Sequence, residues 1–335
     1  MEKEKNLMFS SSPHLHSGDT VSSAMKDVTL ALIPVSVVAI YFFKANAVFL
    51  MLVCILTAML TEVIFRRAMR KESQLQDGSA VLTGLLIALC FPATASWWIA
   101  AAATFIGVGI GKELLGGLGW NRFNPALLGR VSVILFAPWL TLLNNDFSLL
   151  KVNFPGLDAI SQATPLALLK GGLPMPNLGT LFVAYPGGAM AETSALALLL
   201  GGAYLLYRKH INWYIPVSII ATVLIGAAVS GQNPLYHLIS GGLLLGALFM
   251  ATDWVTSPIT QKGQIIFGVC IGILIVIFRV FLAPTEGVAF SILIMNAFVP
   301  MIDRATRRMK FGETSLPAGL EPVTDKPSIA TNKGV

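Results

Sequence analysis

The sequence predicts an all-α integral membrane protein of about ten transmembrane helices, arranged as two inverted five-helix repeats. Of its 335 residues, 55% are hydrophobic and only 12% are charged, whereas soluble domains carry about 25% charged residues. Apolar runs of near-spanning length recur from residue 28 to residue 303, and segments of the two halves resemble each other. Lipid therefore solvates most of the chain, and we expect neither a soluble catalytic domain nor a nucleic-acid partner.

Ten apolar segments are expected to enter the membrane. Several are shorter than the ~20 residues that a full crossing needs. Short segments interrupted by Gly or Pro are typical of broken helices around an internal site. The expected segments are, in order, 28–43, 45–65, 79–91, 97–110, 125–139, 193–207, 214–229, 238–250, 263–282 and 287–303.

The internal repeat is indicated by three pairs of segments that match in the same order. Residues 79–94 resemble 240–252, residues 28–33 resemble 193–198, and Asn124-Pro125 is echoed by Asn296 and Pro300. Because five is odd, the second copy would enter the membrane upside down, as in many transporters. The alternative is that helices rich in Leu, Ala and Gly look alike by composition alone. The domain limits that follow are 1–27, 28–140, 141–191, 192–306 and 307–335.

The distribution of basic residues predicts the orientation. Eighteen of the 23 Lys and Arg fall on one side, with the N-terminal segment, the cluster at 66–71 and the tail after residue 303. The other side, with its adjoining segment ends, holds only Lys44, Arg130, Lys151, Lys170 and Arg279. The positive-inside rule therefore predicts that both termini are cytoplasmic and that the 141–191 connection, an extracytoplasmic loop, lies outside.

The external loop contains Asp158-Ala-Ile-Ser161-Gln-Ala163-Thr164-Pro165-Leu166. By itself, a Ser/Thr-rich loop is usually a turn or a helix cap. The stretch Gly187-Gly-Ala-Met-Ala-Glu192 then leads into an apolar segment. A helix N-terminus there would suit an anion; the alternative is a plain turn with Glu192 in the first helical turn.

Polar residues at membrane depth are the remaining candidates. Asn121 and Asn124 precede the fifth segment, where they offer hydrogen bonds to a ligand or cap the helix. Carboxylates suit a hard cation, and the acids near membrane depth are Glu62, Glu113, Glu192, Asp253 and Asp303. Glu62 pairs with Arg66 at i,i+4 and Glu113 follows Lys112, so these two are expected to be structural. Asp253 and Asp303 are the candidates for an ion pathway.

Other polar and small residues have simpler expected roles. Arg130 and Arg279 could neutralise a phosphate or extend to the interface. The cysteines Cys54, Cys90 and Cys270 lie scattered in apolar runs without metal-ligand spacing, so we expect them to pack in the core. The glycines of 107–111 lie within an apolar segment, where they predict close helix packing.

Four of these motifs together resemble a known family. Ser12-Pro-His-Leu-His-Ser17, the Gly- and Asn-containing stretch 116–130, the 158–166 motif and the stretch 192–202 follow one another in the family's order. In this, the chain resembles the RnfD component of the Rnf electron-transport complex and, more distantly, the NqrB component of the Na⁺-pumping NADH:quinone oxidoreductase. The resemblance extends from about residue 8 to residue 310.

The resemblance implies an integral-membrane flavoprotein of a prokaryotic cell membrane. FMN would be joined through its phosphate to Thr164 by a flavin transferase, with Asp158, Ser161 and Ala163 at the other motif positions; Gln162 departs from the family's usual small residue. Glu192 would adjoin this flavin. Asn121 and Asn124 would be candidates for a second, non-covalent flavin, riboflavin.

The resemblance also implies a component that relays electrons between ferredoxin and NAD⁺ within the Rnf complex, coupled to Na⁺ or H⁺ translocation. The other membrane and cluster-bearing Rnf subunits would be its partners. We expect no net reaction from this chain alone, because it carries no NAD fingerprint and no cluster ligands. Two alternatives stay open: a component of a quinone-reducing complex, and a cofactor-free inverted-repeat channel or carrier for solutes. Covalently bound flavin would exclude the channel or carrier. Dependence of the activity on quinone would distinguish the quinone-reducing complex from the Rnf complex.

Overall fold

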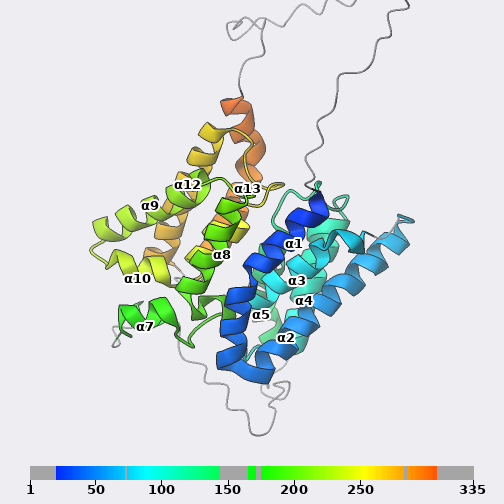
Figure 1. The fold of residues 1–335 in the computed structure, drawn as a ribbon, viewed down its shortest axis with the longest axis horizontal. Helices are drawn as coiled ribbons and strands as arrows, with labels where there is room; N and C mark the ends of the chain where they lie inside the picture. Colours follow the sequence, from blue (N-terminus) through cyan, green and yellow to red (C-terminus); the bar gives the residue numbers. More distant parts are fainter. Residues whose placement is uncertain (1–19, 72–73, 144–164, 171–174, 283–285, 308–335) are drawn as a thin grey trace, which may run out of the picture.

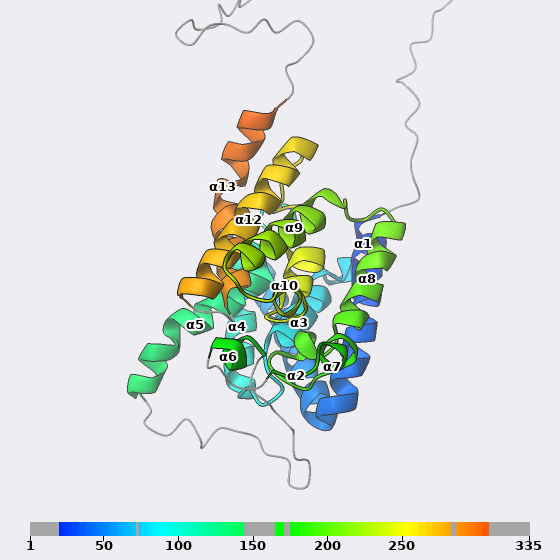
Figure 2. The same cartoon turned by 90° about the vertical axis from the view of Figure 1, so that its left-hand side faces the viewer.

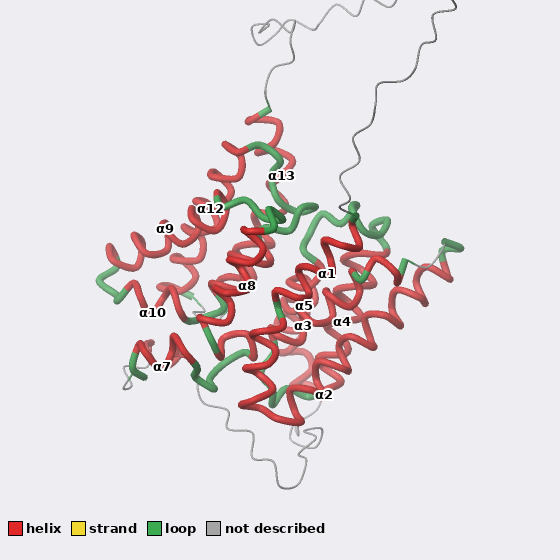
Figure 3. The backbone as a smooth tube through the Cα atoms, in the orientation of Figure 1, coloured by secondary structure: helices red, strands yellow, loops and turns green. Residues whose placement is uncertain are grey.

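The computed structural model describes residues 20–71, 74–143, 165–170, 175–282 and 286–307, and its elements are all helices (Figures 1 and 3). The predicted all-helical membrane architecture is confirmed. The elements are α1 (Val21–Ala31), α2 (Ile33–Ala68), η1 (Leu75–Asp77), α3 (Ser79–Cys90), α4 (Trp97–Val108), η2 (Gly109–Glu113), α5 (Pro125–Leu143), α6 (Pro165–Lys170), α7 (Leu178–Val183), η4 (Met190–Thr193), α8 (Ala195–Tyr207), α9 (Tyr214–Val229), α10 (Pro234–Ile239), α11 (Leu243–Leu245), η5 (Gly246–Met250), α12 (Gln261–Phe281) and α13 (Gly287–Thr306).

The first two crossings form a helical hairpin. The helix α1 continues almost directly into α2, and α2 reverses at Lys44, whose φ of 52° and ψ of −130° are not helical. Positive φ is uncommon for a residue with a side chain, so this single residue makes the turn that the sequence predicts between 43 and 45. The hairpin begins at Val21, within the stretch that was expected to be an N-terminal segment.

Two short helices enter the centre of the molecule without crossing it. At 1.5 Å per residue, α3 is about 18 Å long and the α11–η5 segment about 12 Å, against a hydrocarbon core of about 30 Å. Each begins directly after a left-handed glycine, Gly78 with φ 77° and Gly242 with φ 65°. The stretch expected as one segment over 238–250 is therefore broken at Gly241 and Gly242, because the chain turns through conformations that glycine adopts readily.

The packing of the two halves follows one pattern. The helix α2 packs on α4 as α9 packs on α12, and α4 packs on α5 as α12 packs on α13. The helix α1 contacts α8, which holds the corresponding place at the start of the second half. This order is consistent with two five-helix units, to which α6, α7 and α10 are additional short helices.

Small residues let α4 and α5 approach closely. A Cβ on Gly107 would lie 2.5 Å from the Pro125 carbonyl oxygen, and a Cβ on Gly129 would collide with the carbonyl oxygen of Ala103. The two backbones therefore touch, as the glycines of 107–111 predict.

The outer surface is that of a membrane protein. Among the described residues, three helical stretches are long and apolar enough to cross a bilayer: Val21–Ala68, which contains the turn at Lys44, Gln261–Phe281 and Gly287–Thr306. On α2, Leu52, Leu56, Leu60 and Ile64 are each more than half exposed. Their i,i+4 spacing makes a continuous apolar stripe, and lipid is the solvent that suits it.

The two ends of the described chain lie on one side of the molecule. The start of α1 and the end of α13 point the same way, while the reversal within α2 and the short helix α7 lie at the opposite end (Figures 1 and 2). We call these the termini side and the loop side.

Candidate functional site

Two cavities border the short central helices from opposite ends. The termini-side pocket is lined by the start of α3 and by residues at and beyond the end of η5, including Ser79, Leu82, Phe249 and Thr252. The loop-side pocket is lined by the end of α3 and the start of the α11–η5 segment, including Cys90 and Gly242. The two short helices therefore run in opposite directions, as an inverted repeat requires.

Hydrogen bonds of Asn124 link the walls of the two pockets. Asn124 lines the termini-side pocket and Met250 lines the loop-side pocket. The Asn124 Nδ2 donates to the Met250 carbonyl oxygen at 3.1 Å. The side-chain oxygen of Asn124 accepts from the N–H groups of Ala126 at 3.0 Å and Leu127 at 3.3 Å. Asn124 thus caps α5 and joins it to η5, which is the expected alternative to ligand binding.

Asn121 differs from Asn124 in the hydrogen bonding of its side-chain oxygen. Its Nδ2 donates only a long hydrogen bond of 3.5 Å to the Phe123 carbonyl oxygen. Its Oδ1 is buried and has no hydrogen-bond partner among the described residues. Because an unsatisfied buried acceptor costs free energy, Asn121 is the member of the pair that is suited to a ligand.

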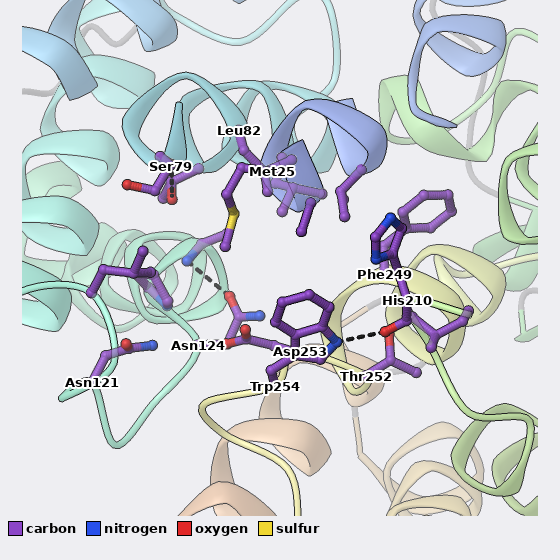
Figure 4. Close-up of a pocket in the computed structure, with 18 of the residues that line it drawn as sticks. Met25, Ser79, Leu82, Asn121, Asn124, His210, Phe249, Thr252, Asp253 and Trp254 are labelled. Carbon is purple, nitrogen blue, oxygen red and sulfur yellow. Dashed lines mark hydrogen bonds between the residues drawn. The ribbon is translucent and has the colours of Figure 1, made fainter. Parts of the chain in front are cut away.

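Figure 4 shows the termini-side pocket between Met25 and Leu82 on one wall and Asn124, Asp253 and Trp254 on the other. The indole Nε1 of Trp254 donates to the His210 carbonyl oxygen at 2.5 Å. Asp27 of α1 binds His210 at 2.6 Å and Arg208 at 2.9 Å. These contacts fasten α1, the first helix of one repeat, to the turn after α8, the first helix of the other.

A ring of four buried charges adjoins this pocket. The Lys112 Nζ lies 2.8 Å from Glu62 and 3.6 Å from Glu113, and the Arg66 Nε lies 3.0 Å from Glu113 and 3.8 Å from Glu62. Lys112 also donates to the Ser79 Oγ at 2.6 Å. Two cations neutralise two anions, so Glu62 and Glu113 hold structural positions, as expected.

The two acids expected in an ion pathway flank one connection. Asp253 lines the termini-side pocket and accepts from the Thr256 Oγ1 at 3.1 Å. Burial raises the pKa of Asp253, and hydrogen bonds from Thr256 and the Val255 backbone oppose that rise. Asp303 does not line the pocket; it accepts from the Ile259 N–H at 3.0 Å and holds the 251–260 connection against α13.

The loop-side pocket has a cavity of about 320 Å³, within the roughly 300–1,000 Å³ typical of ligand sites. Its wall carries a bidentate ion pair, in which the Arg130 Nη2 lies 2.5 Å and its Nε 3.4 Å from the two oxygens of Glu286. The Arg130 guanidinium also lies 4.8 Å from the centre of the Phe91 ring. Arg130 is therefore already paired.

Glu192 lines the same cavity. It lies in η4 rather than in the first turn of α8, whose N-cap is Ser194 with the Ala197 N–H as donor. Its Oε1 approaches the Gly241–Gly242 turn, since a Cβ on Gly242 would lie 3.8 Å from it. The Glu192 Oε2 is buried and has no hydrogen-bond partner among the described residues.

Arg279 lies behind this turn and is only 3% exposed. It donates to the carbonyl oxygens of His237 at 2.6 Å, Ser240 at 2.9 Å and Gly241 at 3.3 Å. It therefore neither extends to the interface nor lines the cavity. Its three acceptors fix the turn that starts α11, and the Glu192 Oε1 lies beside the same turn.

The loop motif itself falls outside the described residues. This holds for Asp158, Ser161, Ala163 and Thr164. Thr164 directly precedes α6, and Leu166 of α6 is buried against the Gly241 position, where an added Cβ would collide with it. Gly241 lines the loop-side pocket.

Several site residues were not predicted from the sequence. His210, Trp254 and Lys112 line the termini-side pocket, and Glu286 lines the loop-side pocket. Asn296 was noted only as part of the repeat. With its amide oriented so that both atoms are paired, it accepts from the Asn124 N–H at 3.1 Å and donates to the Thr256 carbonyl oxygen at 3.2 Å. For Glu286, the sequence offered one signal: it is an isolated acid between two apolar segments.

Comparison with known proteins agrees with the geometry. The model of the NQR2, RnfD, RnfE family matches residues 8–312. The chain is 40% identical over 317 residues to the D subunit of a Na⁺-translocating ferredoxin:NAD⁺ oxidoreductase complex from Acetobacterium woodii, covering 93% of this chain and 98% of that relative.

Two further relatives are similar along nearly their whole length. The D subunit of a proton-translocating ferredoxin:NAD⁺ oxidoreductase complex from Clostridium ljungdahlii is 39% identical, with 92% of this chain and 97% of the relative covered. The D subunit of an ion-translocating oxidoreductase complex from Stutzerimonas stutzeri is 38% identical, with 88% and 93% covered. A match of this extent, with the all-helical fold, shows that the chain belongs to the NQR2, RnfD, RnfE family.

Proposed function

We propose that this chain is the RnfD-type membrane flavoprotein of an ion-translocating ferredoxin:NAD⁺ oxidoreductase complex, with FMN joined to Thr164 and its ring in the loop-side pocket. The printed names of the relatives support the complex. The other subunits of that complex would be its partners, and a flavin transferase would attach the FMN.

The single observation that carries the flavin assignment is the contact between α6 and the loop-side pocket. Leu166 is packed against Gly241, which lines that cavity. Thr164 is two residues from Leu166, so its Cα lies within about 7.6 Å of the Leu166 Cα along the chain. A group tethered at Thr164 therefore starts close to the cavity.

The residues of the loop-side pocket suit an isoalloxazine ring. The cavity has the volume of a ligand site. The Glu192 Oε2, which has no hydrogen-bond partner among the described residues, offers a hydrogen-bond acceptor or, when protonated, a donor. Because Arg130 already forms a salt bridge with Glu286, its charge is not available to bind a phosphate. The part of FMN that we expect against this wall is therefore the ring. When bound, the flavin supplies the electron-transfer chemistry, while the protein orients it and tunes its potential.

A second flavin, riboflavin, is proposed at the termini-side pocket on the strength of Asn121. Its Oδ1, which has no hydrogen-bond partner among the described residues, is a free acceptor on that wall. The cavity there measures about 90 Å³, below the range typical of ligand sites. Binding a tricyclic ring would thus require the wall of the pocket to open. It would open at the contacts that Asp27 and Trp254 make with the 208–213 turn.

We infer further that both termini are cytoplasmic and that the protein contributes to the ion path. The charge asymmetry supports the orientation. Asp253, on the termini-side pocket, and Asp303, beside the same connection, supply the carboxylates that a hard cation would need.

The test of the flavin assignment is the change Thr164→Val, made in cells that also express the flavin transferase. A phosphoester needs the hydroxyl oxygen, so covalent FMN should be lost entirely with almost no change in side-chain volume. The measurement is flavin fluorescence of the protein band on a denaturing gel, with mass spectrometry of the peptide that contains Thr164.

Ser161→Ala is the matched control, because it alters the motif but not the bonded oxygen, and it should retain covalent flavin at a reduced level. An unmodified Thr164 peptide in the wild-type protein would exclude the assignment and favour a cofactor-free carrier. A flavin-loaded complex whose turnover depends on quinone would instead favour the quinone-reducing relative.

A further inference from the structure

Behind the wall of the loop-side pocket lies a buried cation, Arg279, whose charge is only loosely compensated. The Arg279 guanidinium is 3% exposed, and the hydrogen bonds recorded for it within the described chain end on neutral groups, three of them carbonyl oxygens and one the His237 ring. A buried charge is costly unless an opposite charge lies near it. Glu192 and Arg279 both lie against the Gly241–Gly242 turn: a Cβ on Gly241 would lie 2.9 Å from the Arg279 Nη2, and a Cβ on Gly242 would lie 3.8 Å from the Glu192 Oε1.

The remaining charges around Glu192 are already paired. Arg130 of α5 and Glu286, directly before α13, form their own bidentate salt bridge. His237 of α10 binds Gln232 at 2.6 Å and faces Arg279. Cys90 of α3 lines the cavity as a thiol. Arg279 and Glu192 are thus the pair whose balance a new charge in the cavity would disturb.

We propose that Glu192 and Arg279 form a redox-linked charge pair, in which Glu192 binds one proton when a flavin in the loop-side pocket gains one electron. The proposal rests on the proposed flavin at Thr164. With oxidised flavin, the Glu192 carboxylate balances Arg279. When an electron adds a negative charge to the flavin, that charge balances Arg279 instead, and the carboxylate becomes the excess anion.

The step is balanced in electrons and atoms. The electron comes from the preceding carrier in the complex, or from dithionite in the experiment. The proton comes from bulk solvent and forms an O–H bond on the Glu192 Oε2, which has no hydrogen-bond partner to displace among the described residues. No bond breaks in the protein, and both electron and proton leave on reoxidation. The pocket keeps the same net charge in both states, which avoids burying an uncompensated charge.

The experiment is a redox titration of the covalent FMN in the purified complex at several pH values around neutrality. The wild-type potential should fall as pH rises, with one proton taken up per electron. Glu192→Gln is nearly isosteric but cannot ionise, so the part of the pH dependence that comes from Glu192 should disappear. The potential should also rise, because Arg279 is then balanced only by reduced flavin.

Glu286→Gln is the matched control, since Glu286 lines the same cavity but is committed to Arg130. It removes one negative charge from the same wall and should shift the potential while leaving the pH dependence intact. If Glu192→Gln does not assemble, Glu192→Asp keeps a carboxyl group and should retain the pH dependence with a shifted potential.

The possible results separate the two proposals. A Glu192→Gln protein that carries FMN and keeps the wild-type pH dependence would overturn the charge pair and leave the flavin assignment standing. A wild-type potential that does not vary with pH would overturn it as well. A wild-type protein without covalent FMN would instead overturn the proposed function.

Discussion

At the scale of single residues, similar side chains hold different positions in the two pockets. Asn124 uses its amide to cap α5 and to reach the Met250 carbonyl oxygen, whereas Asn121, three residues earlier, keeps a buried oxygen free within the described chain. Asp253 lines a pocket, whereas Asp303 binds a backbone N–H. Residue type alone does not distinguish these roles, because they depend on which partner lies within hydrogen-bond distance.

The two acids give a residue-scale prediction. Asp253→Asn should lower ion uptake by reconstituted complex while leaving its flavin content intact, because it removes a carboxylate from the wall of the termini-side pocket. Asp303→Asn should lower uptake less, since an amide oxygen can still accept from the Ile259 N–H. Sodium or proton uptake into proteoliposomes, normalised to bound flavin, is the measurement. Wild-type uptake by both variants would assign these acids to structure.

At the scale of elements, breaks in the helices position the chemistry. The left-handed glycines Gly78 and Gly242 start the two short helices, and Lys44 turns α2 back on itself. Near the start of each short helix, a buried cation forms hydrogen bonds with the chain. Lys112 reaches Ser79 at the start of α3, and Arg279 reaches Gly241 before α11. Each repeat thus uses one buried cation beside the start of its short helix.

The buried ring of charges gives an element-scale prediction. Lys112→Met should cost about 3–5 kcal/mol, because it leaves buried carboxylates without their partner, and the junction of α2, α3 and η2 should loosen. Thermal unfolding of the detergent-solubilised protein measures this effect. The control is Lys262→Met, at an exposed lysine, which should change little. The double variant Lys112→Met with Glu62→Gln should recover part of the loss. Equal stability of Lys112→Met and wild type would contradict a structural role for the ring.

At the scale of the whole molecule, the two halves enclose pockets that neither half could make alone. Each pocket takes one wall from α3 and the other from the α11–η5 segment or its end. The wall between them is joined by the contact of Asn124 with Met250. Under the proposed function, electrons or ions would pass between the antiparallel short helices, at the interface of the repeats.

The orientation gives a prediction for the whole molecule. A reporter that is active only in the cytoplasm should work when fused after Lys310 and should fail when inserted after Lys151. A reporter that is active only outside the membrane should give the opposite pattern. The 18-to-5 distribution of Lys and Arg is the physical reason. External activity of the fusion after Lys310 would contradict the proposed orientation.

The sequence by itself determined the features that depend on local composition. Hydropathy located the membrane segments to within a few residues over most of the chain, as for 79–91 against α3 and 214–229 against α9. The turn at Lys44, the packing role of Gly107 and the structural roles of Glu62 and Glu113 were also readable. These features depend on neighbours along the chain or on the solvent, which the sequence specifies directly.

Only the tertiary structure decided which residues share a cavity. Glu286 and Arg130 lie 156 positions apart, and Glu192 meets the Gly241–Gly242 turn in the middle of the second repeat. The break of 238–250 into α10, α11 and η5 also depends on tertiary contacts, since Arg279 and Leu166 hold the Gly241 turn. A single sequence contains no distances between its segments, and hydrogen bonds and charge pairs act only over a few ångströms. The pairing of charges in each pocket therefore appears only once the two halves have packed together.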